Sequence, residues 1–229
     1  MKNEFEGITT DRKTLADAFE FLIKRKKELF AKKKLSKTTI EKYEKSLCYV
    51  KDFIRNEYKV NDIHLFQIVP SFIEDFAHYL LTKCDICNNT AMKKIANVKS
   101  AFILAHNRGW IKTNPAATYK CTFEEKDPVR LEIDELYTIY SKKIENQRLS
   151  EIRDCYVFMC FTGYAYSDAW NLTLDNLFTG PDGNLWVTKD RQKTDTTECV
   201  PLFPAAIDII NKYSDSPIRQ QSGKLLPQT

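Results

Sequence analysis

Residues 161–176 read FTGYAYSDAWNLTLDN, and this stretch has the form of a segment that aims a side chain at a ligand. A Thr-Gly turn follows an apolar run, and a Ser-Asp pair then opens a short apolar helix. The position best placed to be aimed is 165, directly after the turn. It holds an alanine, whose methyl group offers neither a charge nor a hydrogen bond, so the chemistry must be sought in the surrounding elements.

The motifs of common metal and hydrolase sites are weak or missing. Cys84 and Cys87 have the spacing of half a zinc site, but no second pair follows and no His-x-His lies nearby. We therefore predict no metal. The chain has only six glycines and no Gly-rich phosphate loop, and it contains neither Gly-x-Ser-x-Gly nor His-Glu-x-x-His. The absence of these motifs excludes the hydrolase classes that depend on them.

Basic residues are concentrated in the first half of the chain. Residues 1–126 carry 24 Lys and Arg against 16 Asp and Glu, whereas residues 127–229 carry 11 against 15. A charge run is often only a solvated surface. The asymmetry nevertheless favours a polyanion-binding first half. The start of the chain lacks a secretory signal, and no stretch approaches the 18 apolar residues of a membrane span. Seven scattered cysteines favour reduced thiols and a cytoplasmic location.

Apolar periodicity predicts four helices in that first half. The first runs from a cap at Thr14 to about residue 34, and the second from 36–39 to about 54. A third spans about 70–82, and a fourth, capped by Asn88 or Asn89, extends to about 107. Four helices with short links make a compact all-α domain.

The polar faces of the second and fourth helices are the best candidates for a binding surface. Short hydroxyl and amide side chains lie there beside lysines, which suits DNA because lysines bind phosphates and polar tips can read base edges. A solvated lysine face remains the alternative. Ser46 lies on the same polar face of the second helix and is expected to reach phosphates as well. The candidate DNA-binding residues are Thr38, Thr39, Lys42, Lys45, Lys93, Lys94, Asn97 and Ser100.

The second half has a different texture, because polar and extended residues around 119–130 end the helical pattern. Helices are expected at about 133–145 and 149–162. Pro181-Asp182-Gly183 and a turn near 194–196 then divide a β-branched and aromatic stretch into a three-stranded antiparallel meander. A helix follows from Pro204 to Tyr213, and the tail after it shows no closing element.

Five segments in the right order make the sequence resemble the tyrosine recombinases, the phage-integrase family, and in particular integrases of bacterial conjugative elements. Residues 162–168 match the family's Thr-Gly-Leu-Arg-x-Ser-Glu box, and residues 191–194 match its β-hairpin lysine. The others are 38–43, 89–93 with 109–115, and 131–136. The resemblance implies a mainly α chain: an all-α core-binding (SAM-like) domain at 13–118 after an extension at 1–12, a linker at 119–130, and part of an α+β catalytic domain at 131–229.

The family's chemistry, which the resemblance implies here, is the attack of a tyrosine on a DNA phosphodiester. Arginines, a lysine and a His or Trp neutralise the transition-state charge and protonate the leaving oxygen, and no cofactor is needed. The first family arginine falls on Ala165, although some members lack it. The resemblance makes Lys193 the general acid, and Arg191, two residues earlier on the same strand, is the candidate substitute for the missing arginine.

The remaining family residues, a His-x-x-Arg motif and a late tyrosine, should follow Tyr213, and none is found before Thr229. We therefore expect a fragment that binds double-stranded DNA without cleaving it, from a parent that assembles as a tetramer on DNA to integrate or excise a mobile element. Two alternatives stay open. One is a non-catalytic DNA-binding regulator derived from a recombinase, and the other is a helical protein-interaction module with solvated lysines.

Overall fold

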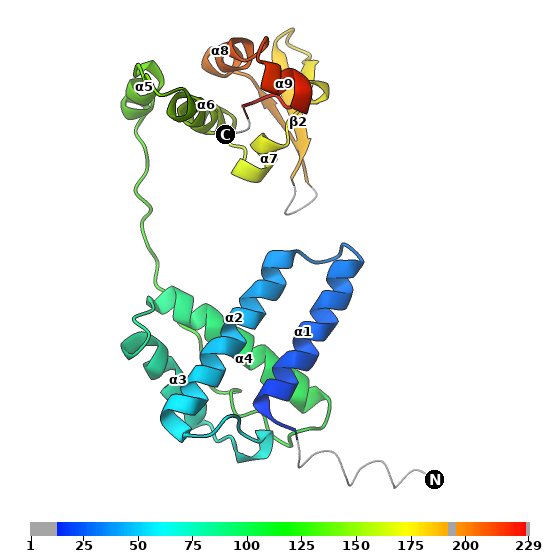
Figure 1. Cartoon of the computed structure of the whole chain (residues 1–229), viewed down its shortest axis with the longest axis vertical. Helices are drawn as coiled ribbons and strands as arrows, with labels where there is room; N and C mark the ends of the chain where they lie inside the picture. The colour runs from blue at the N-terminus through cyan, green and yellow to red at the C-terminus, as the bar shows by residue number, and fades with distance from the viewer. Residues whose placement is uncertain (1–12, 192–195, 228–229) are drawn as a thin grey trace. The chain divides into compact units, whose positions relative to one another are not determined.

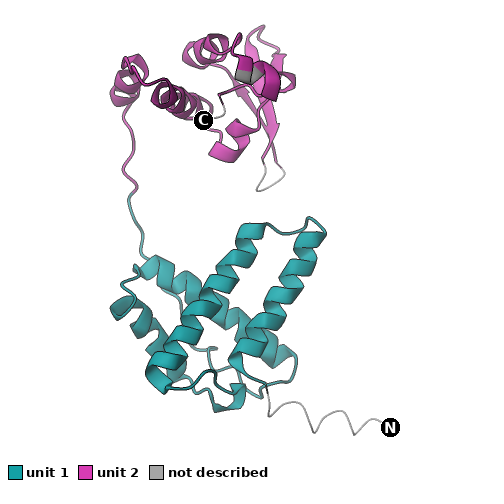
Figure 2. Cartoon of the chain, viewed as in Figure 1, with its two compact units in different colours: residues 1–127 teal, residues 128–229 magenta. Residues whose placement is uncertain are grey.

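The computed structural model describes residues 13–191 and 196–227, and it divides the chain into two compact units, Met1–Asp127 and Pro128–Thr229 (Figure 2). Unit 1 is all helical, and unit 2 combines helices with one small sheet (Figure 1). The predicted fold class, mainly α with a small three-stranded antiparallel sheet, is confirmed.

Unit 1 is built from four main helices, α1 (Leu15–Ala31), α2 (Lys37–Phe53), α3 (Ser71–Thr82) and α4 (Asn88–Asn107). A short π-helical turn (Ile54–Tyr58) extends α2, and a 3-10 turn (Leu65–Gln67) precedes α3. The predicted cap of α1 is confirmed: Thr14 Oγ1 accepts a hydrogen bond from the Asp17 amide at 3.2 Å, and the Asp17 carboxylate accepts one from the Thr14 amide. This reciprocal pair satisfies two amides that the first helical turn leaves free.

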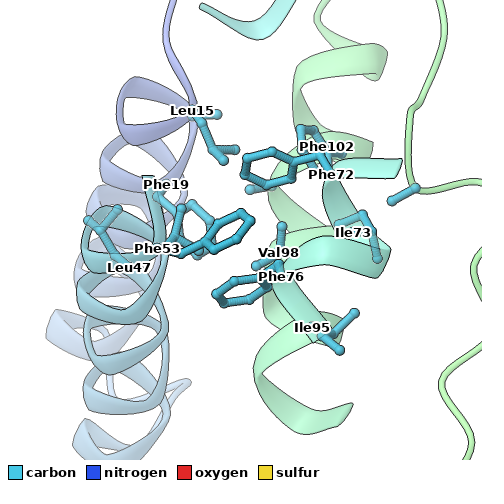
Figure 3. Packing of buried hydrophobic residues seen from close by; sticks show 14 of the residues in the cluster. Leu15, Phe19, Leu47, Phe53, Phe72, Ile73, Phe76, Ile95, Val98 and Phe102 are labelled. Carbon is cyan, nitrogen blue, oxygen red and sulfur yellow. The ribbon is translucent and has the colours of Figure 1, made fainter. Parts of the chain in front are cut away.

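The core of unit 1 contains an aromatic cluster that joins α2 to α3 and α4 (Figure 3). Phe53, at the end of α2, lies 5.2 Å from Phe72 and 5.3 Å from Phe76 between ring centroids, and all three are buried. Phe102 of α4 meets Phe72 edge to face at 6.3 Å. Burial of these large rings fixes the angles at which the helices cross and so determines which faces remain outside.

The start of α4 differs from its prediction. Cys87, and not Asn88 or Asn89, occupies the N-cap position. The two asparagine amides instead donate to the carbonyls of Thr122 and Glu124, at 2.9 and 2.8 Å. The extended segment predicted as a linker is therefore attached to α4 as far as residue 124, because its backbone groups find partners in these side chains.

Unit 2 begins with α5 (Ile133–Ser141) and α6 (Gln147–Thr162), followed by the short helix α7 (Tyr166–Trp170) and a 3-10 turn (Leu174–Asn176). The helix α5 ends about four residues earlier than expected. Its end is held by Arg153 of α6, whose guanidinium donates to the carbonyls of Ile139, Tyr140 and Lys142. A cation supplied by another helix thus supplies donors to carbonyls at a helix end, where the helix itself offers few.

The sheet of unit 2 has the order β1 (Leu177–Thr179), β2 (Leu185–Asp190) and β3 (Thr197–Pro201), antiparallel throughout. Val187 pairs with Val200, and Lys189 pairs with Glu198. Because side chains alternate along a strand, Val187 and Lys189 project to the same side. Val187 is fully buried in the core of unit 2, so Lys189 extends the core-facing side of β2 toward the hairpin.

The end of the chain is more ordered than its sequence indicates. After α8 (Pro204–Lys212) a further helix, α9 (Pro217–Ser222), is followed by a segment in which Leu225 and Leu226 are buried. The Leu225 amide donates to the Leu172 carbonyl at 2.7 Å, beside a bridge between Thr173 and Lys224. The expectation that this tail has no closing element is wrong, because these two leucines complete the core around α7.

Candidate nucleic-acid interface

Three of the predicted DNA-binding lysines gather where α2 packs against α4. Lys42 and Lys45 are exposed on α2, and Lys94 of α4 lies with its ammonium 4.0 Å from the centroid of the Tyr49 ring. Burial lowers the pKa of Lys94, and the positive charge of the neighbouring Lys45 lowers it further. The junction therefore holds like charges close together, and an anion bound there would relieve their repulsion.

Asn97 and Ser46 lie beneath these lysines. Asn97 Nδ2 donates to Ser46 Oγ at 2.9 Å, and Ser46 Oγ donates to the Lys42 carbonyl at 2.9 Å. Ser46 is 1% exposed, so the expectation that it reaches phosphates is wrong. Its hydroxyl is buried between the helices and satisfied there. The pair fixes how α2 and α4 pack and thereby positions the lysines above it.

The other predicted residues of this surface are separate from that junction. At the start of α2, the hydroxyls of Thr38 and Thr39 lie 2.9 and 3.0 Å from Ser36 Oγ, next to amides of the first helical turn. Lys93 is exposed on α4. Ser100 is half-buried and donates back to the Ala96 carbonyl at 2.9 Å. Of the eight predicted DNA-binding residues, Lys42, Lys45, Lys94 and Asn97 lie together at the α2–α4 junction, and the other four lie apart from it.

In unit 2, the Thr-Gly turn is held rigidly. Gly163 ends α6 at a φ of 72°, where a residue with a side chain would be strained, and its amide donates to the Met159 carbonyl. Tyr164 is buried and donates to the carbonyls of Val187 and Glu198, at 3.3 and 2.9 Å. Burial, with the charge of Glu198, raises the pKa of Tyr164 to about 12. Ala165 follows, exposed at the N-cap of α7.

The hairpin between β2 and β3 lies beside this turn, since Tyr164 joins the two. Arg191 follows the last residue of β2, and its guanidinium lies 3.4 Å from the Glu198 carboxylate in a partly exposed ion pair. The Arg191 amide donates to the Thr196 carbonyl at 2.9 Å. Lys193, the predicted general acid, lies outside the described residues.

Two features of unit 2 were not expected from the sequence. Asp154 is buried, and it is bound by Arg153, Lys212 and Tyr213 together. Tyr213 donates to it at 2.6 Å, and burial and the Asp154 charge raise the pKa of the phenol. Lys189 donates to the backbone carbonyl of Asn171 at the end of α7. Alternation along β2 could have indicated Lys189, whereas Asp154 sits in a helix whose apolar period is weak.

Within the described parts of the chain, no three His, Cys, Asp or Glu side chains come close enough together to hold a metal ion. None of the helices described there is both long and apolar enough to cross a membrane.

Comparison with known proteins places this architecture. The family model of the phage integrase SAM-like domain matches residues 14–121, and no curated protein sequence matches the chain. A lambda integrase tetramer bound to a Holliday junction superposes with a TM-score of 0.72 at 18% identity, covering 96% of this chain and 61% of that one.

Two further structures show the same similarity. A lambda integrase dimer bound to a COC' core site gives a TM-score of 0.69 at 16% identity, covering 96% of this chain and 58% of that one. The Tn1549 transposon integrase in complex with a circular intermediate DNA gives 0.64 at 14% identity, covering 89% and 65%. This chain therefore spans about three fifths of the length of these lambda integrase chains. The family model of the phage integrase SAM-like domain thus covers residues 14–121, and the chain shares the fold of the lambda and Tn1549 integrase structures.

Proposed function

We propose that this chain binds the phosphate backbone of double-stranded DNA through the α2–α4 junction, as part of a tyrosine recombinase that integrates or excises a mobile element. The observation that carries the proposal is the gathering of Lys42, Lys45 and Lys94 there. Lys94 and Lys45 are close enough for the charge of one to affect the pKa of the other, and none of the three forms an ion pair among the described residues.

Other lysines of unit 1 behave differently. Lys27 and Lys51 are paired with Glu44 and Glu20, at 2.7 and 3.2 Å, so part of the basic charge is neutralised within the unit. The charges of the junction lysines are not neutralised by a carboxylate of the described residues, so they are available to a bound anion. Lysines that replace condensed counterions on DNA give strong, salt-sensitive binding. The other predicted residues would then flank these phosphate contacts: Asn97, Thr38, Thr39, Lys93 and Ser100.

Neutralising the junction is expected to weaken DNA binding. The variant Lys42→Gln/Lys45→Gln should reduce the slope of log affinity against log salt by about 2, which is about 1 for each lost phosphate contact. The control Lys59→Gln/Lys112→Gln removes the same charge from positions beyond the ends of α2 and α4, and it should change the slope much less. Fluorescence anisotropy of a labelled duplex, titrated at several salt concentrations, gives the slopes. Equal slopes for both variants would reject the interface.

For strand cleavage we propose that Lys193 protonates the leaving oxygen and that Arg191 contacts the scissile phosphate in place of an arginine at position 165. Arg191 follows a strand whose partner strand is joined to the Thr-Gly turn through Tyr164. Its ion pair with Glu198 is partly exposed, so a phosphate could compete with that carboxylate. These groups stabilise charge but provide no nucleophile.

The 229 residues contain no His-x-x-Arg sequence, and Tyr213 is buried against Asp154. With a nicked suicide duplex, we therefore expect this chain to form no covalent phosphotyrosyl adduct. In a longer recombinase that contains these residues, Lys193→Ala and Arg191→Ala should both reduce adduct formation. If Arg191→Ala left cleavage unchanged while Lys193→Ala abolished it, the role given to Arg191 would be wrong. Denaturing gel electrophoresis of the labelled duplex measures both.

A second candidate function, a DNA-binding regulator without catalysis, is favoured by Ala165, whose exposed methyl group leaves the best-aimed position of the box uncharged. The assay with the nicked suicide duplex separates the two functions, because a covalent adduct formed by the longer protein excludes a regulator without catalysis. Self-association on DNA is part of the recombinase proposal, and cross-linking with and without duplex would detect it.

A further inference from the structure

The end of α7 holds a pair of lysines that come from distant parts of unit 2. Lys189 Nζ, on β2, donates to the Asn171 backbone carbonyl at 3.1 Å. Lys224 Nζ, in the segment after α9, donates to the Asn171 side-chain oxygen Oδ1 at 2.9 Å. One asparagine thus holds two ammonium groups, on its two oxygens, from positions 18 and 53 residues away in the chain.

The arrangement around Asn171 is fixed on every side. Its Nδ2 group donates to the Ser167 carbonyl at 2.8 Å, and its amide donates to the Asp168 carbonyl at 3.1 Å. Lys224 is held by the backbone bridge to Thr173 and by the neighbouring buried Leu225. Lys189 is anchored in the β2–β3 ladder. All three residues are half-buried, so the two ammonium groups are placed by the fold and are not free on flexible surface side chains.

Among the described residues of unit 2, no carboxylate forms an ion pair with either lysine of this pair, although unit 2 carries more acidic than basic residues. Asp168, the acid of α7, is buried, and Glu198, the cross-strand neighbour of Lys189, is paired with Arg191. Each ammonium has three donors, and within the described part of the chain only one acceptor is found for each.

We propose that Lys189 and Lys224 form a second phosphate-binding site of this chain, which holds a phosphodiester of the DNA backbone near the scissile one. This inference rests on the proposed function and extends it to unit 2. Ala165 begins α7 and Asn171 ends it. The six residue steps from Ala165 to Asn171 rise about 9 Å at about 1.5 Å each, a length over which one DNA strand presents roughly two to three phosphates at about 3.4 Å of axis each.

A purely structural role is the competing explanation, since cations at a helix C-terminus interact favourably with its exposed carbonyls. Replacement by glutamine separates the two explanations. In Lys189→Gln/Lys224→Gln the amide groups can still donate to Asn171, but both positive charges are gone. The control Lys142→Gln/Lys143→Gln removes the same charge from exposed positions after α5 in the same unit.

The experiment measures binding of a labelled mixed-sequence duplex by the full 229-residue chain at several salt concentrations. For Lys189→Gln/Lys224→Gln we expect the salt slope to fall by about 2 and affinity at moderate salt to fall roughly tenfold. The effect should add to that of Lys42→Gln/Lys45→Gln because the two sites lie in different units. The control should bind nearly as the wild type does.

A second variant keeps the test valid if the glutamines loosen the fold. Asn171→Asp retains both oxygen acceptors for the lysines and places a carboxylate between the two ammonium groups, so it should lower the salt slope with both lysines in place. It also loses the Nδ2 donor to the Ser167 carbonyl, and exchange protection of unit 2 checks that the fold is kept. If the wild type binds DNA and Lys42→Gln/Lys45→Gln weakens it, but Asn171→Asp and the glutamine pair bind like the control, the second site is refuted alone. If the wild type shows no salt-dependent binding, the proposed function fails and this site fails with it.

Discussion

Replacing Asp154 with alanine is expected to lower the free energy of unfolding of unit 2 by about 3 kcal/mol, because removal of one partner from a buried ionic network leaves the others uncompensated. Asp154 is 2% exposed, and its carboxylate binds Arg153 Nε at 2.5 Å, Lys212 Nζ at 2.7 Å and the Tyr213 hydroxyl at 2.6 Å. Lys212 can return to water, whereas Arg153 remains largely buried.

The loss of unfolding free energy in Asp154→Ala should depend on pH. Burial raises the pKa of Asp154, but hydrogen bonds from Lys212, Tyr213 and Arg153 outweigh it and hold the pKa below its ordinary value of 3.8. A carboxylate with a lowered pKa in the folded state stabilises the protein above its unfolded-state pKa, and this contribution disappears as the pH falls through the folded-state pKa. The difference between wild type and Asp154→Ala should therefore be full near neutral pH and shrink below about pH 4.

Amide hydrogen exchange of peptides from residues 128–227 measures this difference without interference from unit 1. Asp215→Ala is the matched control, since Asp215 is exposed and its loss should change protection little. A pH-independent difference, or one that grows as the pH is lowered, would show that the Asp154 charge does not stabilise unit 2.

The helices of unit 1 could be predicted because each has one continuous apolar face. On α2, Ile40, Leu47 and Val50 repeat at helical spacing, and all three are buried. The same periodicity placed Lys42 and Lys45 outside the core. It could not show that Ser46, which lies beside that face, is buried under α4, because the contact with Asn97 depends on how closely two helices pack.

Unit 2 was harder to predict because its contacts join short segments far apart in the chain. Leu225 and Leu226 form a doublet without a period, so nothing in the local sequence indicates that they fill the core next to Leu172. Asn171 and Lys224 are 53 residues apart, and neither has a local signal of binding. The Thr-Gly turn was found because glycine is needed at its left-handed position, whereas the role of Tyr164 in joining that turn to β3 follows only from the tertiary structure.

Replacing Phe53 with alanine is expected to have the largest effect on unit 1. The Phe53 ring is fully buried, and its centroid lies within 5.2 to 5.6 Å of those of Phe72, Phe76, Tyr79 and Tyr58. Deletion of a buried ring costs about 3–5 kcal/mol through lost burial and the cavity left behind. Since small domains are stable by only about 5–15 kcal/mol, much of the stability of unit 1 should be lost.

The consequence for function follows from the position of Phe53 at the end of α2, the helix that carries Lys42 and Lys45. At a temperature where Phe53→Ala has unfolded unit 1, salt-dependent DNA binding through the α2–α4 junction should be lost, while exchange protection in residues 128–227 stays as in the wild type. Phe66→Ala is the control, because that ring is 58% exposed. Equal loss of protection in both units would mean that the two cores unfold together, and the independence of unit 2 would then be wrong.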